Sequence, residues 1–484
     1  MTGVQTCALP IFNIPYRYWQ LDSWFYPKDD GTLIWEPDIK YFPNGLAYLS
    51  AKLGGPFICH NRWFSVHTQY KSQYSEFITE EHVDMNKPYW DPKNKNSKKI
   101  RRWSFPTKID VWRDLMEHAR SWNCVCYEQD WLQPQWRFFD YLRENVYSGR
   151  QWLKNMSDAA ADYGLTLQYC MTYPSFYLQT LELPNVTHAR CSDDYNHRKS
   201  KRIYVPHFTQ TAMLSWALGI FPWKDPFFST CIPEPGSISV IKKTSGHYEQ
   251  WAELEFLMQV LSAGPVGNGD SVENLNKNLL MQSCREDGLL IKPDRPLFPI
   301  DLMFLNHNKP YICLTYSTVN DIRTYYLLEI LIWSKKVFEH YVTLEELGLS
   351  GNFVIYDYFD KNCKVLESTT PIGKERPLNQ NEHYFGILAP ILSNGMAWIG
   401  LRDKIATMSN MVFSAINATP NTLHVEGYYL PRTEFAVTAY IPQKPKLVKV
   451  NGTETTKYTW GTHFQIFTII LFSDEEKFTL DIEI

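Results

Sequence analysis

The sequence predicts an α/β chain with two domains: a (β/α)₈ TIM barrel in residues 12–296 and a C-terminal all-β sandwich in residues 297–484. The barrel is predicted because short apolar segments alternate with helical patterns from Tyr16 to about Asp270, as in parallel βα units. The sandwich is predicted because alternation of apolar and polar residues, broken by turn signals, replaces helical spacing from about Leu297. A length of 484 residues fits two or three domains.

Seven segments of the first domain are predicted to be buried parallel strands, because each is short and apolar on both faces. They are Tyr16–Leu21, Pro56–His60, Cys124–Glu128, Thr166–Met171, Thr187–Cys191, Gly219–Trp223 and Gly264–Val266. A closed barrel of this class requires eight strands. Residues 1–11, MTGVQTCALPI, read like the translation of a sequencing-adapter oligonucleotide. We therefore expect them to be an artefact and the first strand to be encoded upstream.

Helices are predicted between these strands, most clearly in Tyr248–Ser262, whose apolar residues recur at helical spacing and can face a sheet. The other predicted helices are Val111–Trp122, with Asp110 at the helix start, Gln151–Tyr163 and Phe208–Leu218. The strands predicted for the second domain are Tyr311–Tyr316, Tyr325–Trp333, Phe353–Tyr358, Phe385–Leu392, Met396–Leu401, His424–Tyr429, Glu434–Ile441 and His463–Phe472.

Charge and hydropathy argue against nucleic-acid and membrane partners. The formal net charge is −4 and the pI is near 6.4, so no basic face is implied. The longest basic run, Lys93–Arg102, is interpreted as a solvated loop. No apolar run approaches the roughly 18 residues needed to cross a bilayer. Without a genuine N-terminus the localisation stays open, with a secreted or lysosomal place favoured over the cytoplasm, and the oligomeric state is open as well.

No cofactor or metal is predicted. The ten cysteines show no C-x-x-C and no Cys/His spacing suited to zinc, although they leave room for a single disulfide. Cys126, Cys170 and Cys191 fall in predicted strands, where a free cysteine behaves as a small hydrophobe. Aromatic residues make up 15% of the chain, which fits either large aromatic cores or stacking on sugar faces.

Carboxylates and aromatic residues follow the predicted strands at the end where such barrels place functional side chains. They are Asp22, Trp24, His60, Arg62, Trp63, Glu128, Asp130, Trp131, Tyr173, Arg190, Asp193, Asp194, Trp223, Asp225, Asn268 and Asp270. One Asp of this kind could simply cap the next helix. Several strands ending so, interleaved with Trp, are harder to explain by capping. A metal site is the competing use of a carboxylate cluster, but it requires closer-spaced oxygen ligands.

Six segments in the same order resemble glycoside hydrolase family 36 and its relatives in family 27, within clan D. The segments Trp19–Trp24 (WQLDSW) and Phe42–Leu46 (FPNGL) are similar to "DDGW … FP-G-L". The segment Cys126–Leu132 (CYEQDWL) resembles the K-x-D nucleophile strand, and Ala189–Tyr195 (ARCSDDY) resembles the R-x-S-D-D-F of raffinose synthases. Finally, Pro222–Ser229 (PWKDPFFS) is similar to "PDWDMF-S", and Glu253–Val266 is similar to a helix and strand ending S-G-G-P-V.

The resemblance implies a retaining α-glycosidase that hydrolyses or transfers a glycosyl group on a carbohydrate substrate. It places the nucleophile at Asp130 and the acid/base at Asp194, with Asp193 as the rival. A retaining enzyme needs these two carboxyl groups about 5–5.5 Å apart. The other predicted site residues would bind the substrate; they are Asp22, Trp24, Trp63, Glu128, Trp131, Tyr173, Arg190, Asp193, Trp223 and Asp225. Of these, Arg190 would hold the nucleophile or a sugar hydroxyl.

Two departures from the family pattern put galactose specificity in doubt. The paired Asp of DDGW is Leu21-Asp22, and the Lys of K-x-D is Glu128. We therefore expect a substrate other than a simple α-galactoside, unless Glu128 turns away from the sugar or pairs with a nearby Arg. The same departures leave a second class open, a non-catalytic carbohydrate-binding protein on this scaffold. A structural role or an unrelated α/β-barrel function is the third reading.

Overall fold

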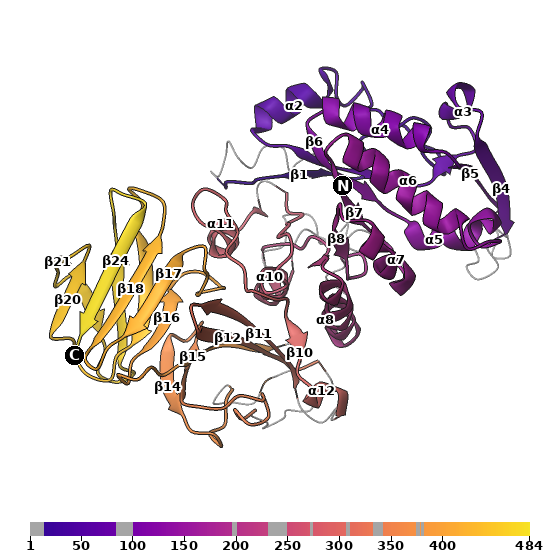
Figure 1. The fold of residues 1–484 in the computed structure, drawn as a ribbon. Coiled ribbons are helices and arrows are strands. Elements are labelled where there is room, and N and C mark those ends of the chain that lie inside the picture. The colour runs from indigo at the N-terminus through magenta and orange to yellow at the C-terminus, as the bar shows by residue number, and fades with distance from the viewer. Residues whose placement is uncertain are drawn as a thin grey trace. The chain divides into compact units, whose positions relative to one another are not determined.

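The computed structural model of the chain describes residues 14–83, 100–195, 201–230, 249–271, 274–305, 310–332, 342–373, 378 and 382–484. The chain divides into two compact units (Figure 1). The first contains residues 1–190 and 217–221, and the second contains residues 191–216 and 222–484. The limits given above for the barrel and sandwich domains stay a prediction.

A six-stranded sheet forms the framework of the first unit. Its strand order is β1 (Trp19–Leu21), β2 (Phe57–Asn61), β6 (Cys124–Gln129), β7 (Thr166–Tyr169), β8 (Val186–Arg190) and β9 (Phe221–Trp223). The first five strands pair in parallel, each with the next. Six of the seven predicted strands are therefore confirmed. Strand β9 begins in the first unit and ends in the second.

The seventh predicted strand, Gly264–Val266, is wrong. Its residues have no regular strand structure, and only an isolated bridge joins the nearby Asn268 to Phe227. Two local features explain this. Pro265 has no N–H to donate to a ladder, and Gly264 lies so close to the backbone that an added Cβ would sit 1.9 Å from the carbonyl oxygen of Pro222. The described residues thus form an open parallel sheet, and a complete eight-stranded barrel is not shown.

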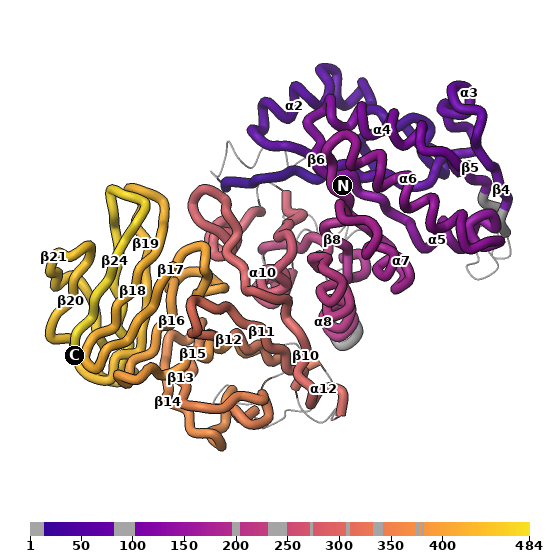
Figure 2. Tube along the Cα trace, viewed as in Figure 1, coloured from indigo at the N-terminus to yellow at the C-terminus, as the bar shows by residue number. Residues whose placement is uncertain are grey.

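Helices α4 (Ile109–Ser121) and α6 (Ser148–Asp162) pack side by side in the first unit, as Figures 1 and 2 show. Both were predicted within three residues. In α4 the buried residues recur at helical spacing and form the apolar stripe that packs inward. Asp110 lies in the first turn of α4 and the N-cap position is Lys108, so the predicted helix start is two residues late.

The other helices are shorter or belong to the second unit. They are α2 (Gly45–Leu53), α3 (Tyr70–Gln73), α5 (Leu132–Phe138), η2 (Asp140–Leu142), α7 (Pro174–Gln179), η3 (Thr180–Glu182), α8 (Lys201–Ala217), α10 (Ala252–Val260), α11 (Lys277–Leu280), η5 (Met281–Ser283) and α12 (Leu302–Leu305). Helices α8 and α10 confirm the two remaining helix predictions, although α8 begins seven residues before the predicted segment.

A small antiparallel sheet, unpredicted from the sequence, follows β2. Its order is β3 (Phe64–Ser65), β5 (Ile100–Pro106) and β4 (Phe77–Val83). Strand β5 contains the end of the basic run, so the loop interpretation is wrong there, while residues 93–99 lie outside the described residues. Arg102 pairs across the ladder with Glu81, Nε to Oε1 at 2.5 Å. This cross-strand pairing is a long-range property that the local charge pattern does not reveal.

The C-terminal part of the second unit consists mainly of β-strands, as predicted, and these strands pair antiparallel. Its sheets have the orders β10-β11-β12-β15-β13-β14, β16-β19-β23-β22 and β17-β18-β24-β20-β21. The strands are β10 (Phe298–Pro299), β11 (Tyr311–Val319), β12 (Ile322–Ile330), β13 (Phe353–Asp357), β14 (Asn362–Leu366), β15 (His383–Pro390), β16 (Ala397–Leu401), β17 (Phe413–Ala418), β18 (Thr422–Tyr428), β19 (Phe435–Tyr440), β20 (Leu447–Val450), β21 (Thr453–Glu454), β22 (Tyr458–Trp460), β23 (Ile466–Leu471) and β24 (Lys477–Glu483). Each of the eight predicted segments overlaps one of them.

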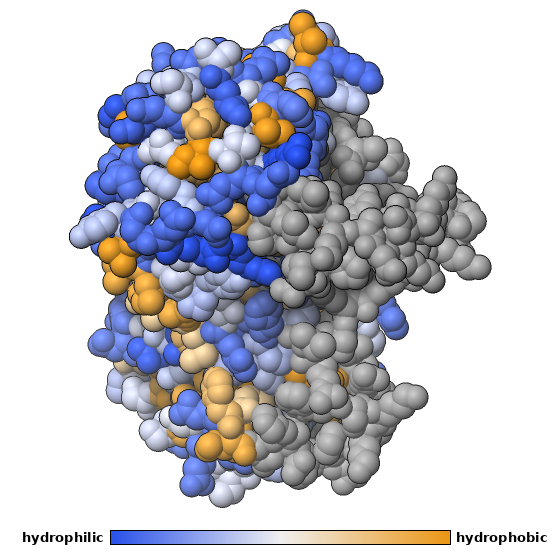
Figure 3. All heavy atoms as spheres, turned by 90° about the vertical axis from the view of Figure 1, so that its right-hand side faces the viewer, coloured by the Kyte–Doolittle hydropathy of each residue, from blue (hydrophilic) through white to orange (hydrophobic). Residues whose placement is uncertain are grey.

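Cysteines and surface hydropathy are unexceptional within the part of the chain that the structure describes. All eight cysteines in it are buried. On the face shown in Figure 3 hydrophilic side chains predominate, with smaller hydrophobic groups between them. None of the helices in the described ranges is both long and apolar enough to cross a membrane.

Candidate active site

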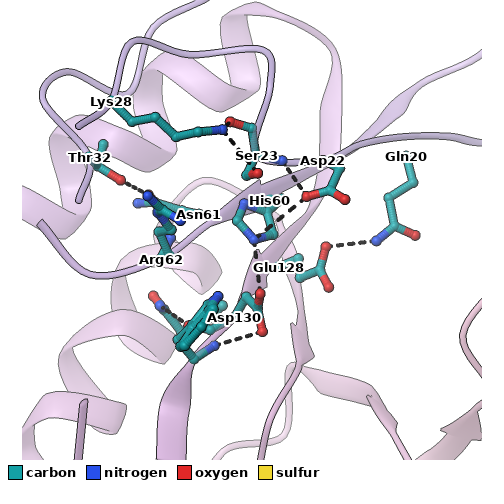
Figure 4. Close-up of polar contacts among 12 residues, drawn as sticks. Gln20, Asp22, Ser23, Lys28, Thr32, His60, Asn61, Arg62, Glu128 and Asp130 are labelled. Atoms are coloured by element: carbon teal, nitrogen blue, oxygen red, sulfur yellow. Dashed lines mark hydrogen bonds and ion pairs between the residues drawn. The ribbon is translucent and has the colours of Figure 1, made fainter. Parts of the chain in front are cut away.

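Three neighbouring strand ends of the first unit bring polar side chains together (Figure 4). In the parallel ladder His60 of β2 is in register with Glu128 of β6, so both side chains leave the same face of the sheet. Asp22 follows β1 directly, and Asp130 lies two residues beyond Glu128. Alternation along a strand places residues two apart on one face, which groups Glu128 with Asp130.

Asp130 is held on both carboxylate oxygens. Its Oδ2 lies 3.1 Å from His60 Nε2, and its Oδ1 accepts a hydrogen bond from the backbone N–H of Trp131 at 2.7 Å. Burial raises the pKa of Asp130, but the hydrogen bond and charge of His60, helped by Arg190 and the Cys170 thiol, outweigh it and lower the pKa below its usual value. Asp130 is therefore a carboxylate at neutral pH.

His60 is the group around which the carboxylates gather. Its Nε2 lies 3.1 Å from Asp130 Oδ2 and 3.9 Å from Asp22 Oδ1, and its Nδ1 lies 3.1 Å from the Tyr26 hydroxyl. The side chain is only 4% exposed. Burial lowers the pKa of His60, yet the hydrogen bond to Asp130 and the charges of Asp130, Glu128 and Asp22 raise it above the ordinary value overall. A protonated imidazole is thus favoured beside Asp130.

Glu128 behaves differently from its neighbour. It is buried, and Gln20 Nε2 donates a hydrogen bond to its Oε2 at 2.7 Å. Burial, with the charges of Asp130 and Asp22, raises the pKa of Glu128 to about 7, against the lowering effect of His60 and Arg190. Near neutral pH much of Glu128 is therefore a carboxylic acid, which donates as well as accepts. Within the described part of the chain, its hydrogen-bond partner is the amide of Gln20 and not an arginine.

The backbone beside Asp130 adopts an unusual conformation. Trp131 has φ 60° and ψ 34°, in the left-handed region that bulky residues rarely occupy, and Met171 after β7 has φ 50°. The backbone N–H of Gln133 donates to the carbonyl oxygen of Met171 at 2.8 Å, and this hydrogen bond joins the segments that follow β6 and β7. Such conformations persist where the surroundings impose them, commonly at functional sites. Here the turn brings the Trp131 N–H onto Asp130.

Tryptophans line one side of this turn. Trp131 packs edge-on against Trp63, with ring centroids 4.5 Å apart, and Trp63 stacks on Trp103 at 4.2 Å. Trp63 is buried, whereas Trp131 is partly exposed and presents apolar surface next to Asp130. Aromatic faces of this kind suit the C–H edges of sugars. Trp24 stacks on Phe42 at 5.6 Å, and Tyr173 accepts a hydrogen bond from Gln133 Nε2 at 2.7 Å.

The predicted site residues are divided between the two units. The first unit holds Asp22, Trp24, Trp63, Glu128, Asp130, Trp131, Tyr173 and Arg190, and the second holds Asp193, Asp194, Trp223 and Asp225. Within the second unit Asp193 and Asp194 are exposed and Trp223 is buried. Asp225 Oδ2 accepts a hydrogen bond from the backbone N–H of Tyr195 at 2.6 Å. The structure thus groups the predicted residues within each unit, and the pairing of Asp130 with Asp194 stays a prediction.

Sequence reasoning missed three residues of the first-unit cluster. His60 was recognised as a strand-end residue but given no role, and Gln20 and Tyr26 were not singled out. The signal for Gln20 was available, because it is a polar residue in a predicted apolar strand, two positions before Asp22 and so on the same face. No comparable local signal marks Tyr26. Among the described residues, no group of three or more His, Cys, Asp or Glu side chains is placed to hold a metal ion.

No protein-family model matches the chain, and no curated protein matches it. Solved structures do match. A GH27 β-L-arabinopyranosidase from Geobacillus stearothermophilus is 14% identical, with a TM-score of 0.54, over 81% of this chain and 92% of that chain. A GH31 dextranase from Flavobacterium johnsoniae in complex with glucose is 12% identical, with a TM-score of 0.54, over 99% of this chain and 68% of that chain. Families 27 and 31 both belong to clan D, and the structural matches do not single out family 36. In fold the chain is therefore similar to clan D glycoside hydrolases, which combine a TIM barrel with β-domains.

Proposed function

We propose that the chain is a retaining glycosidase or transglycosidase that acts on an α-linked sugar, with Asp130 as the nucleophile. The observation that carries the proposal is the Asp130 carboxylate itself. It stands at the end of a parallel strand, ionised and oriented by His60 Nε2 at 3.1 Å and Trp131 N–H at 2.7 Å, beside a partly exposed tryptophan. The fold supports the proposal, because the solved structures it resembles are a dextranase and an arabinopyranosidase.

The proposed reaction has two steps. A carboxylate oxygen of Asp130 attacks the anomeric carbon as the bond to the leaving oxygen breaks, and an acid protonates that oxygen. Water or an acceptor hydroxyl then attacks the anomeric carbon of the glycosyl ester. The residue that acted as the acid in the first step removes the proton of the attacking group, and Asp130 leaves as a carboxylate. We assign the acid/base role to Asp194 from the motif Ala189–Tyr195, with Asp193 as the rival.

The proposed substrate is not a simple α-galactoside. Glu128 replaces a lysine that always donates, and Leu21 removes one carboxylate that would accept from sugar hydroxyls. Substrate contacts are assigned to Asp22, Trp24, Trp63, Glu128, Trp131, Tyr173 and Arg190 in the first unit and to Asp193, Trp223 and Asp225 in the second. The aromatic members would stack on sugar faces, and the polar members would bind hydroxyl groups.

Trapping the glycosyl-enzyme tests the proposal. The full chain is incubated with a panel of activated 2-fluoro α-glycosides and then digested for peptide mass spectrometry. We expect one sugar to add the mass of a single fluoroglycosyl group to the peptide that contains Asp130. Asp130→Asn should take no label. Asp162→Asn is the matched control, because Asp162 is an exposed carboxylate in the same unit, paired with Arg113 Nε at 3.0 Å on the surface.

Two results would contradict the proposal in different ways. A label on another carboxylate would refute Asp130 as the nucleophile while keeping the enzyme class. Absence of label with every sugar, together with calorimetric binding of one of the corresponding free sugars, would favour a non-catalytic carbohydrate-binding protein on this scaffold.

A further inference from the structure

Two cations stand at the edge of the candidate active site, Lys28 in the loop after β1 and Arg62 directly after β2. In Figure 4 both lie on one side of His60, whereas Asp22 and Glu128 lie on the other. Both cationic side chains are partly exposed, so a ligand can reach them. Neither takes part in the proposed reaction, and their contacts indicate what they bind.

The backbone of Arg62 lies beside that of the proposed nucleophile. The N–H of Asp130 donates to the carbonyl oxygen of Asn61 at 2.9 Å, and Arg62 is the next residue. The central carbon of the Arg62 guanidinium lies 4.6 Å from the centroid of the Trp63 ring, which in turn packs against Trp131 with centroids 4.5 Å apart. Arg62 thus extends the tryptophan surface next to Asp130 and adds a positive charge to it.

The protein uses the guanidinium of Arg62 incompletely. Within the described ranges its one side-chain hydrogen bond runs from Nη2 to the backbone carbonyl oxygen of Asp29, at 3.3 Å. Its Nε is buried and has no hydrogen-bond partner in the same ranges. A guanidinium carries five N–H donors, and buried donors without a partner cost free energy. Most of the donors of Arg62 therefore remain available to a ligand.

Lys28 is held by neutral oxygens. Its Nζ donates to the backbone carbonyl oxygen of Ser23 and to the Ser23 hydroxyl oxygen, the latter at 3.0 Å. Burial lowers the pKa of Lys28, the charge of Arg62 lowers it further, and the charge of Asp22 acts in the opposite sense. The two cations are thus close enough to repel each other. An anion that contacts both would offset this repulsion.

The loop that carries Lys28 also contains two aspartates, whose carboxylates bind other groups. Asp29 Oδ1 accepts from the N–H of Gly31 at 2.9 Å, and its Oδ2 accepts from the Ser65 hydroxyl at 2.8 Å. Asp30 Oδ2 accepts from Trp103 Nε1 at 3.1 Å. Among the described residues, the two cations are therefore hydrogen-bonded to neutral oxygens only.

We propose that Lys28 and Arg62 form a binding site for an anionic group, a carboxylate or a sulfate, on the sugar that Asp130 attacks. A guanidinium presents paired N–H donors that match two oxygens of such a group, and an ammonium adds a compact positive charge. The inference rests on the proposed function and names the substrate class of that site. The substrate is an α-linked acidic sugar, either a uronic acid or a sulfated hexose.

Calorimetry on the full chain compares acidic sugars with neutral sugars of the same ring. The probes are glucuronic acid and glucose 6-sulfate against glucose, and galacturonic acid against galactose, each at low and high salt. We expect one acidic sugar to bind about 10- to 100-fold more tightly than its neutral counterpart, as for a hydrogen bond to a charged group. Salt should weaken that binding and leave the neutral sugar unaffected, because the added contacts are ionic. Which acidic sugar binds distinguishes a carboxylate from a sulfate.

Variants then assign the preference to the two cations. Arg62→Met keeps a side chain that packs on Trp63, and it should lower the preference for the acidic sugar by about tenfold or more without changing the affinity for the neutral one. Arg62→Lys retains the charge and should recover part of the preference. Lys28→Met should act in the same direction as Arg62→Met. Arg113→Met is the matched control, because Arg113 is a cation of the same unit that pairs with Asp162 at 3.0 Å on the surface; its preference should equal that of the wild type.

Two results would overturn the inference. One is that the acidic sugars bind the wild type no more tightly than their neutral counterparts, or do not bind at all, and this result is decisive even if Arg62→Met fails to fold. The other is that Arg62→Met weakens acidic and neutral sugars equally, since a purely structural role of Arg62 would have that effect.

Trapping with 2-fluoro α-glycosides separates this inference from the proposed function. If an acidic sugar binds in an Arg62-dependent way but its fluoroglycoside labels no carboxylate, the anion site stands and the proposed enzymatic function is refuted. If a neutral fluoroglycoside labels Asp130 and the acidic ones do not, the proposed function stands and the acidic substrate is refuted.

Discussion

His60 Nε2 lies 3.1 Å from Asp130 Oδ2, although the two residues are seventy positions apart in the chain. The parallel register of β2 and β6 produces this proximity, because it pairs His60 with Glu128 and Asn61 with Gln129, and Asp130 follows directly. The same register places Glu128 in the group. Three ionisable side chains with different protonation behaviour therefore meet at two adjacent strand ends.

Asp130→Asn should abolish turnover and leave the fold intact. The amide cannot attack the anomeric carbon as a carboxylate does, and we expect kcat/KM to fall by at least about a thousandfold. Its oxygen can still accept from Trp131 N–H, so circular dichroism and cooperative unfolding should resemble those of the wild type. Steady-state kinetics on the sugar that labels the wild type are the measurement. Equal activity in the variant would show that Asp130 is not the nucleophile.

Glu128→Gln should stabilise the chain at high pH. The pKa of Glu128 is about 7 in the folded chain and ~4.3 in an unfolded one, so its contribution to stability is present below pH ~4 and is lost as pH rises through 7. The glutamine variant avoids that loss. Its free energy of unfolding, relative to wild type, should rise between pH ~4 and ~7 and level off at no more than about 4 kcal/mol.

Urea unfolding from pH 4 to 9 measures this difference. The matched control is Glu182→Gln, at an exposed glutamate paired with Arg150 at 2.5 Å, whose effect should be small across the range. If the difference in the free energy of unfolding between Glu128→Gln and the wild type does not change with pH, then Glu128 is ionised or solvated over the whole pH range, and the prediction is contradicted.

Simple α-galactosides should be poor substrates. Relative to the family pattern, Leu21 lacks a carboxylate and Glu128 lacks an obligate donor, and each mismatch in a buried polar pocket costs roughly 1–3 kcal/mol. Together, at roughly 2–6 kcal/mol, they correspond to about 30- to 10⁴-fold in kcat/KM. Rates on aryl α-galactoside and a panel of other aryl α-glycosides decide the matter. An α-galactoside that is the best substrate by a wide margin would show that neither residue sets the specificity.

The ion pair of Lys224 and Glu255 should be structural and strongly coupled. Nζ and Oε2 are 2.7 Å apart, both side chains are 0–1% exposed, and the Tyr195 ring lies 5.2 Å from the ammonium group. Lys224→Met alone leaves a buried charge and should lower the free energy of unfolding by about 3–5 kcal/mol. Adding Glu255→Leu should recover most of the loss, because replacing both charges with apolar groups is often neutral.

A double-mutant cycle by chemical denaturation measures this coupling. The control cycle uses Arg113 and Asp162, whose side chains are 3.0 Å apart but about half exposed (46% and 48%), and its coupling should be below about 1 kcal/mol. Coupling of similar size in the two pairs would contradict the role of burial.

The sequence by itself determined the local elements of this protein. Six strands of the first sheet and the paired helices could be predicted because apolar runs and helical spacing reflect burial of each segment, and Cys124–Glu128 matches β6 to within one residue. The position of Asp130 after that strand followed from the same pattern. The strand prediction for Gly264–Val266 was wrong. A short apolar run indicates burial, but the proline in this run has no N–H to donate to a neighbouring strand.

Only the tertiary structure decided the protonation states of the strand-end residues. Glu128 and Asp130 are two residues apart, yet the pKa of one is raised to about 7 and that of the other is lowered. The difference comes from His60 and from burial, and both depend on the register of β2 against β6. Protonation is set by distances between segments far apart in the chain, and no local pattern encodes those distances.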